Sequence, residues 1–254
     1  MNKKFLRLFV STLVIVGLSS CSTPREDRIK RMSAVQLLEE GDREVKSGNY
    51  KSSVDHFNAV EARFPHSSLA EQAKFNKIYA LYHDRNFDEA LREIDDFMKL
   101  YPNHPDIAYA WYMQGLINFD RARSILDKLM PPDRSKIDQQ QMTDSLNSFL
   151  HILEHYPDSV YADDSAKRVV YLRNTLAESE MHIAEFYFKR KAYVGAANRA
   201  QYVLDHYDQT PSLSDALYLQ VKSYRELGLT DLAENRLALL RHNFPQDSRL
   251  AEFN

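Results

Sequence analysis

Hydrophobic residues recur along this chain at helical spacing, and the segments that carry them end at the same kind of turn. An aromatic residue is followed by proline at Phe64-Pro65, Tyr101-Pro102, Tyr156-Pro157 and Phe244-Pro245, and Tyr207-Asp208 stands in the same place without the proline. Steps of 37, 55, 51 and 37 residues separate the aromatics. Because proline lacks a backbone N–H and disfavours helix in the residue before it, each pair predicts a helix end.

Each of these segments also carries a small residue, usually with a larger one four positions later. The small residues are Ser53, Ala90, Ser145, Ala196 and Ala233, and the residues four further on are Phe57, Ile94, Phe149, Ala200 and Leu237, with Ala200 the exception in size. Small residues let two antiparallel helices approach closely, and the larger ones fill the space between neighbouring pairs. The spacing resembles the second helix of a tetratricopeptide repeat (TPR), and Trp111 with Gly115 matches its first helix, as does Leu37 with Gly41.

The sequence therefore predicts an all-α protein, a TPR superhelical solenoid of about five helix pairs between residues 34 and 250. One repeat cannot bury its apolar face alone, so several must stack. We expect the repeats at approximately 34–67, 68–104, 105–159, 160–210 and 211–248. The two long steps predict insertions. The first is expected to include Met130 to Ser135, and the second to lengthen a helical stretch over Asp163 to Ser179.

Residues 1–20 have the pattern of a lipoprotein signal peptide. Three basic residues precede an apolar run from Leu8 to Leu18, which is too short to span a bilayer as a helix. Leu18-Ser19-Ser20-Cys21 resembles a lipobox, which predicts cleavage before Cys21 and acylation of that cysteine. Residues 21–33 are then expected to be a lipidated, flexible tether. An aspartate after the cysteine would suggest retention at the inner membrane, but Ser22 stands there, so the expected location is the periplasmic face of an outer membrane. The alternative is an ordinary cleaved signal peptide with a free cysteine.

Composition narrows the function classes. The whole sequence has a net charge of -3, and removal of residues 1–20, which hold basic but no acidic residues, makes it more negative. An acidic surface argues against nucleic acid as a partner, because phosphate binding needs a basic face. With a single cysteine, disulfides do not hold the fold.

Two features suggest chemistry but have simpler interpretations. His151-Ile152-Leu153-Glu154-His155 matches the H-x-x-E-H pattern of inverted zinc proteases, yet in the repeat register Ile152 is a buried position and the histidines are surface residues. Adjacent carboxylates, as at Glu39-Glu40, Asp95-Asp96 and Asp163-Asp164, point apart on a helix and predict solvated faces. No glycine-rich phosphate loop or nucleophile elbow is present, so we expect neither a cofactor nor enzymatic activity.

The repeat register places rings on one side of the first helices. In TPR proteins these helices line a groove, and here the register points six aromatic side chains into it: Phe75, Tyr79, Tyr82, Tyr109, Tyr112 and Phe119. The fourth and fifth repeats offer a charged set instead, made of Glu185, Lys189, Lys222 and Arg225. Such a groove suits an extended peptide, gripped by rings and oriented by polar groups. The alternative for each ring is a place in a helix interface.

Several stretches resemble a known family. They are Gly48-Asn49-Tyr50, Ile78-Tyr79-Ala80-Leu81-Tyr82, His104-Pro105-Asp106-Ile107, Tyr112-Met113-Gln114-Gly115-Leu116, Asp133-Arg134-Ser135, Lys167-Arg168-Val169, Ala184-Glu185-Phe186-Tyr187 and Asn198-Arg199. Together with the lipobox and five repeats, they resemble the YfiO (ComL) family of outer-membrane assembly lipoproteins over essentially the whole chain after Cys21. The fifth repeat departs more, with Thr230 at its turn.

The resemblance implies a non-enzymatic subunit of the β-barrel assembly (BAM) machinery. It implies docking on the periplasmic domains of the barrel subunit BamA through the C-terminal repeats, beside other lipoproteins of the complex. The N-terminal repeats would receive the C-terminal strand of unfolded outer membrane proteins, which ends in an aromatic residue. Arg199 aligns with a family arginine at the BamA contact, and we expect it to face outward. The alternative function is a different lipid-anchored TPR adaptor, for example one that recruits cell-wall hydrolases.

Overall fold

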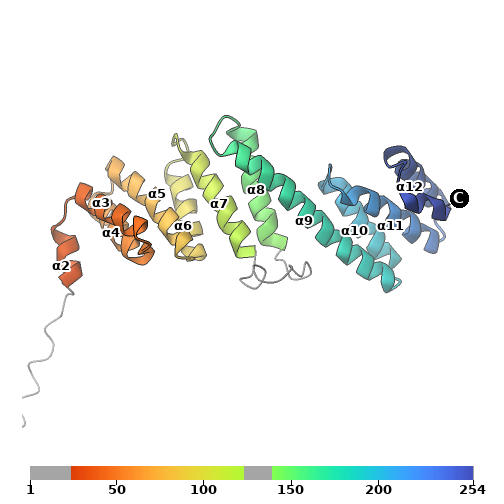
Figure 1. The fold of residues 1–254 in the computed structure, drawn as a ribbon, viewed down its shortest axis with the longest axis horizontal. Coiled ribbons are helices and arrows are strands. Elements are labelled where there is room, and N and C mark those ends of the chain that lie inside the picture. Colours follow the sequence, from red (N-terminus) through yellow and green to blue (C-terminus); the bar gives the residue numbers. More distant parts are fainter. Residues whose placement is uncertain (1–23, 123–138, 254) are drawn as a thin grey trace, which may run out of the picture. The chain divides into compact units, whose positions relative to one another are not determined.

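The computed structural model describes residues 24–122 and 139–253, and all regular structure in these residues is helical. The helices are α2 (Pro24–Arg31), α3 (Ala34–Lys46), α4 (Tyr50–Arg63), α5 (Ser68–His83), α6 (Phe87–Leu100), α7 (Ile107–Ala122), α8 (Gln139–His155), α9 (Ala162–Lys189), α10 (Tyr193–His206), α11 (Ser212–Glu226), α12 (Thr230–Asn243) and the 3₁₀ helix η3 (Ser248–Phe253). They form two compact units (Figure 1), one ending at Arg85 with α2 to α5 and one beginning at Asn86 with α6 to η3. The all-α prediction is confirmed.

The second helices follow the predicted register. Helix α4 ends at Arg63, just before the first aromatic–proline pair, and the Phe64 N–H closes the last turn on the Val60 carbonyl. Helices α6, α8, α10 and α12 likewise end one residue before the aromatic of the turn. All ten predicted small and large positions are buried: Ser53, Phe57, Ala90, Ile94, Ser145, Phe149, Ala196, Ala200, Ala233 and Leu237. The small residue and the residue four positions later therefore mark the face of each second helix that is buried in the core.

Two glycines let a first helix lie very close to its partner. In the first unit, a Cβ added at Gly41 would lie 2.4 Å from Cε1 of Phe57. In the second unit, a Cβ at Gly115 would lie 2.7 Å from the Phe149 ring, and the buried Ser145 hydroxyl donates to the Gly115 carbonyl at 2.8 Å. Only a residue without a side chain fits at either crossing, which explains the predicted pairing of glycine with a bulky residue.

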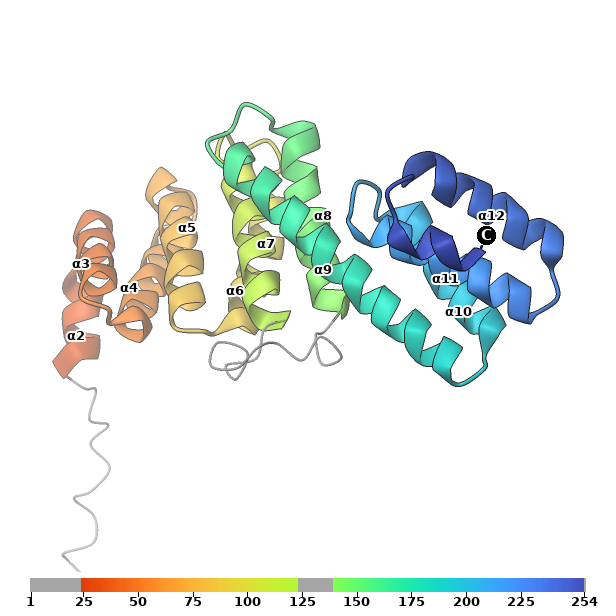
Figure 2. The same ribbon diagram turned by 45° about the vertical axis from the view of Figure 1, so that its right-hand side comes forward.

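Helix α9 is the longest in the described residues and organises the second unit. Its 28 residues include the stretch that was predicted to lengthen the fourth repeat. Leu172 and Leu176 are buried in one cluster with Phe149 of α8 and Val203 of α10. Helix α9 also contacts α11, so one helix joins three neighbours (Figure 2).

Part of the predicted tether is a docked helix. Residues Pro24–Arg31 form α2, and the Arg63 guanidinium donates to the Ile29 carbonyl at 3.0 Å. Arg28 forms an ion pair with Glu40 of α3, and Ile29 packs against the core of the first unit. The prediction of a flexible tether was therefore wrong for these eight residues, because apolar and ionic contacts to α3 and α4 hold them.

Two predictions lie outside the described residues: the signal peptide with Cys21, and the insertion around Met130 to Ser135. Among the helices of residues 24–122 and 139–253, none is long and apolar enough to cross a membrane.

Candidate functional site

The predicted rings of α5, in the first unit, share one helix face. Tyr79 is 39% exposed, while Phe75 and Tyr82 are half-buried. The His83 ring lies 4.3 Å from that of Tyr79, 5.1 Å from that of Tyr82 and 5.2 Å from that of Tyr50, measured between centroids. Burial lowers the pKa of His83, so the imidazole is neutral near pH 7 and adds to an aromatic surface. We call Phe75, Tyr79 and Tyr82 the α5 rings.

The α7 rings, Tyr109, Tyr112 and Phe119, lie in the second unit and are all half-buried, with contacts to Tyr161 before α9 or to α9 itself. The Tyr112 ring stacks on Tyr161 with centroids 4.8 Å apart, and the Tyr109 ring lies 5.9 Å from Tyr161. Phe119 meets Tyr171 edge-on at 5.7 Å. The α7 rings thus combine the two roles that the sequence left open, since each is partly exposed and each packs in a helix interface.

A hydrogen-bonded network fixes the centre of this surface. The Tyr112 hydroxyl donates to Oδ2 of Asp164 at 2.8 Å, and Nε of Arg168 donates to the same oxygen at 2.5 Å. Burial acts to raise the pKa of Asp164, but the bonds from Arg168 and Tyr112 outweigh it and hold that pKa below its usual range. Burial, with the bond to Asp164, raises the pKa of Tyr112, so the phenol keeps its proton and donates.

The sequence did not predict that Asp164 and Arg168 of α9 take part in the surface around the α7 rings. Asp164 was predicted to be a solvated carboxylate, and that prediction was wrong because Tyr112 and Arg168 both bind it. The Arg168 guanidinium lies 5.7 Å from the centre of the Phe119 ring, within the range of a cation–π contact. A second adjacent carboxylate, Glu40, is likewise paired with Arg28 and Arg43 rather than solvated.

The predicted charged set lies around α11. A cavity of about 170 Å³ has Glu185, Lys189 and Lys222 among its lining residues, and apolar side chains of α9 and α11 complete it. Lys189 pairs with Glu185 at 3.7 Å, and Lys222 lies 3.3 Å from the Tyr218 hydroxyl. Arg225 instead pairs with Glu234 of α12 at 3.2 Å. Three of the four predicted residues therefore surround one cavity.

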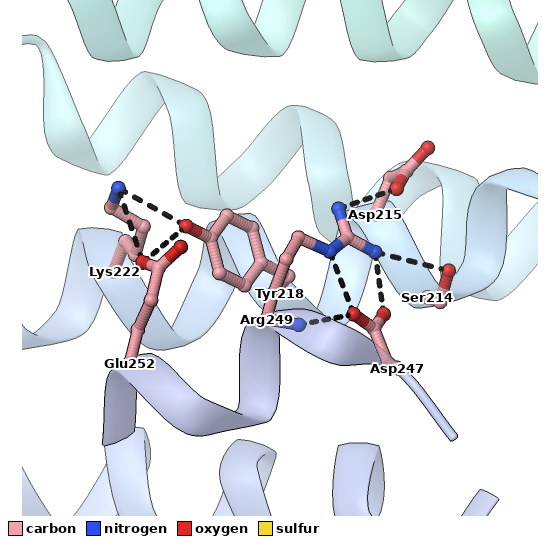
Figure 3. A network of polar contacts seen from close by, with 7 residues as sticks. All are labelled: Ser214, Asp215, Tyr218, Lys222, Asp247, Arg249 and Glu252. Carbon is pink, nitrogen blue, oxygen red and sulfur yellow. Dashed lines mark hydrogen bonds and ion pairs between the residues drawn. The ribbon is translucent and has the colours of Figure 1, made fainter. Parts of the chain in front are cut away.

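The last described residues of the chain form a network of polar contacts with α11 (Figure 3), and Arg249 of this network also lines the cavity. Two side-chain nitrogens of Arg249 in η3 donate hydrogen bonds to the Asp247 carboxylate, at 2.9 and 2.6 Å. A third bond goes to Asp215 of α11 at 2.6 Å. Glu252 accepts from the Tyr218 hydroxyl at 2.6 Å. The bonds to Asp247 and then to Asp215 raise the pKa of Arg249 above its usual range, against the effect of burial. The repeat register gave no signal for this C-terminal network, because η3 follows the fifth repeat.

Arg199 has a partner within the chain. Its Nη1 lies 3.0 Å from Oε2 of Glu180 on α9, whose side chain is 7% exposed, whereas the Arg199 side chain is 43% exposed. The side chain therefore reaches solvent, as expected, but the carboxylate it meets belongs to α9.

The two histidines of the protease-like pattern stack on each other. Their ring centroids are 4.0 Å apart, and the His151 ring lies 3.9 Å from Trp111. Ile152 between them is fully buried, as the repeat register predicted. Within the described parts of the chain, no three histidine, cysteine or acidic side chains are grouped so that they could hold a metal ion.

Helix pairs with these buried positions define a TPR protein. The model of the YfiO family, described as "Outer membrane lipoprotein", matches residues 30–239, and the chain belongs to this family. Outer membrane protein assembly factor BamD of Neisseria meningitidis (serogroup A) is 34% identical over 94% of this chain and 92% of that protein. BamD of Haemophilus influenzae is 30% identical over 94% of this chain and 90% of its own length. The resemblance stated from the sequence is confirmed.

Among solved structures, the "TPR2AB-domain:pHSP90-complex of yeast Sti1" matches with a TM-score of 0.44 and 12% identity, covering 84% of this chain and 78% of that chain.

Proposed function

We propose that this protein is a non-enzymatic lipoprotein subunit of the BAM machinery, which scaffolds BamA and binds unfolded outer membrane proteins for insertion. Family membership carries the proposal, since relatives named as outer membrane protein assembly factors match over nearly the whole chain. The lipobox-like Leu18-Ser19-Ser20-Cys21 supports a location on the periplasmic face of the outer membrane, with acylated Cys21 as the proposed anchor. More than one acyl chain is needed for a stable anchor of this kind.

The α5 and α7 rings support binding of unfolded barrel proteins. Half-exposed rings on first helices offer apolar area at low entropic cost, and the neutral His83 extends the α5 surface. A chain that ends in an aromatic residue with a free carboxylate can pack its ring there.

The ring assignment is tested with a peptide that ends in phenylalanine. Replacing Tyr79 and Tyr82 by alanine should weaken its binding about tenfold, because two contact rings are lost. Tyr202→Ala is a matched control, since Tyr202 is 40% exposed and stacks on His206 of the second helix α10. Equal affinity of the double variant and the wild type would refute the assignment. Circular dichroism must show unchanged helix content.

Arg199 is the proposed contact to BamA. Its guanidinium is partly exposed, and Glu180 holds it in place from below. An arginine fixed in this way can meet a carboxylate of a partner without losing much conformational freedom.

The test separates an interface role from a structural one. Arg199→Gln and Glu180→Gln break the same internal pair, so both should lower stability similarly, but only the first removes the arginine. Pull-down from detergent-solubilised membranes should then lose BamA with Arg199→Gln and retain it, in a smaller amount, with Glu180→Gln, which keeps the arginine but not its fixed position. Loss with both variants, or with neither, contradicts the proposed contact. If the wild type brings down no BamA-like barrel protein, the proposed function itself falls, and an adaptor for other partners takes its place.

A further inference from the structure

A second, larger cavity lies in the second unit between α6, α7 and α8, and its lining shares no residue with the α7 rings or the C-terminal network. Its volume is about 480 Å³, and its lining includes Asp95 of α6, Trp111 and Asn118 of α7, and Asp144 and Asn147 of α8. We propose that this cavity binds an arginine side chain presented by a polypeptide partner. The proposal is independent of the ring surfaces and of Arg199.

The charge of the lining favours a cation. Asp95 accepts a bond from Gln114 at 3.4 Å and Asp144 one from Gln140 at 2.9 Å, so both carboxylates have only neutral donors among the described residues. The one arginine of the lining, Arg121, is already paired with Asp88 at 2.8 Å. Two carboxylates in one cavity without a matched cation attract a positively charged group.

An amide in the lining adds an acceptor. Asn118 is 7% exposed and lines the cavity. Its carbonyl oxygen can accept from an N–H group that is placed there. Asn147 at the rim is exposed and adds a second amide.

The aromatic wall distinguishes arginine from other cations. Trp111 lines the cavity beside His151. Burial is the main cause that lowers the pKa of His151, and the nearby His155 lowers it further. The His151 ring therefore carries no competing charge near pH 7. Tryptophan is the best aromatic partner for a cation. A guanidinium can stack on a ring while its five N–H groups donate to carboxylates and an amide carbonyl, which an ammonium cannot do.

The cavity contains its own probe, because Trp111 is the only tryptophan of the chain. We expect a blocked alanine pentapeptide with a central arginine, titrated into the full-length lipidated protein in detergent, to change the tryptophan emission in a saturable way. Its citrulline counterpart has the same shape without the charge and should bind at least about tenfold more weakly. A lysine peptide should also bind more weakly than the arginine peptide.

Variants locate the response. Asp95→Asn with Asp144→Asn should weaken the arginine peptide at least about tenfold, since both charge-assisted contacts are lost. Asp96→Asn with Asp158→Asn removes the same charge from two exposed positions and should leave binding unchanged. The absence of a saturable change overturns the proposal. Equal binding of the citrulline or the lysine peptide, or an undiminished response in the Asp95/Asp144 variant, also overturns it.

Discussion

The α5 rings and the α7 rings come from the same sequence pattern but have different surroundings. The Tyr79 ring of α5 lies 4.3 Å from the tilted His83 ring of its own helix, and 39% of the residue is exposed. Tyr112 of α7 stacks on Tyr161, the residue before α9, and binds the Asp164 carboxylate of α9. Equivalent positions of two first helices can therefore be partly exposed in one repeat and joined to the next helix pair in another, as the contacts of Tyr112 with Tyr161 and Asp164 show.

The largest expected effect comes from the helix that carries the α7 rings. Gly115→Ala places a Cβ 2.7 Å from the buried Phe149 ring, so α7 must move away from α8. Overpacking of this kind costs about 1–3 kcal/mol of unfolding free energy. Chemical denaturation measures the loss.

The control for Gly115 is another helical glycine. A Cβ at Gly195 of α10 would lie 3.4 Å from the Tyr187 ring, an ordinary contact, so Gly195→Ala should be neutral or stabilise by up to about 1 kcal/mol. If both variants lose stability alike, close helix approach is not what Gly115 provides.

The next largest effect is the loss of stability when one tyrosine hydroxyl is removed from the α7 rings, compared with one removed from the α5 rings. Tyr112→Phe removes the donor to Asp164 and should cost about 1 kcal/mol, because the carboxylate loses one of its two partners. Tyr79→Phe should stay within about 0.5 kcal/mol, as expected for an exposed position. Thermal unfolding of the two variants side by side checks the difference, and a reversed order would show that the α5 rings are the framework.

The smallest effect concerns pH. The pKa of Asp164 is below its usual value of 3.8, so folding favours the ionised carboxylate. Its contribution is present above the pKa of the unfolded state and is lost as pH falls through the lower folded-state pKa. Since the side chain is 46% exposed, we expect less than about 1 kcal/mol.

The measurement is the stability difference between the wild type and Asp164→Asn. It should shrink as the pH falls from about 7 to about 3, while Asp163→Asn, at an exposed neighbour, should show no such trend. A difference that grows towards acid pH would mean that burial, not the bonds from Arg168 and Tyr112, controls this carboxylate.

The sequence predicted the repeats because their signals are local. The small residue, the larger one and the aromatic turn lie within one helix, so Ser53, Phe57 and Phe64 could be assigned without knowing what packs against them. Helix α2 was not predicted, since its contacts come from Glu40 and Arg63, far along the chain.

The candidate surfaces were predicted only in part for the same reason. The register places the rings of α5 and α7 correctly on first helices, but the bond from Tyr112 to Asp164 joins residues 52 positions apart. Its existence depends on the packing of α7 against α9. The C-terminal network depends on η3, which belongs to no repeat and so has no periodic signal.

The two close helix crossings also have a consequence for evolution. At each crossing, the phenylalanine ring of one helix fills the space that a side chain at the glycine of the other helix would need. The pairs are Gly41 with Phe57 and Gly115 with Phe149. A larger residue at the glycine is tolerated only together with a smaller one at the phenylalanine. Among relatives, we therefore expect these pairs to change together, and each crossing to be inherited as a unit even where the surface rings around it diverge.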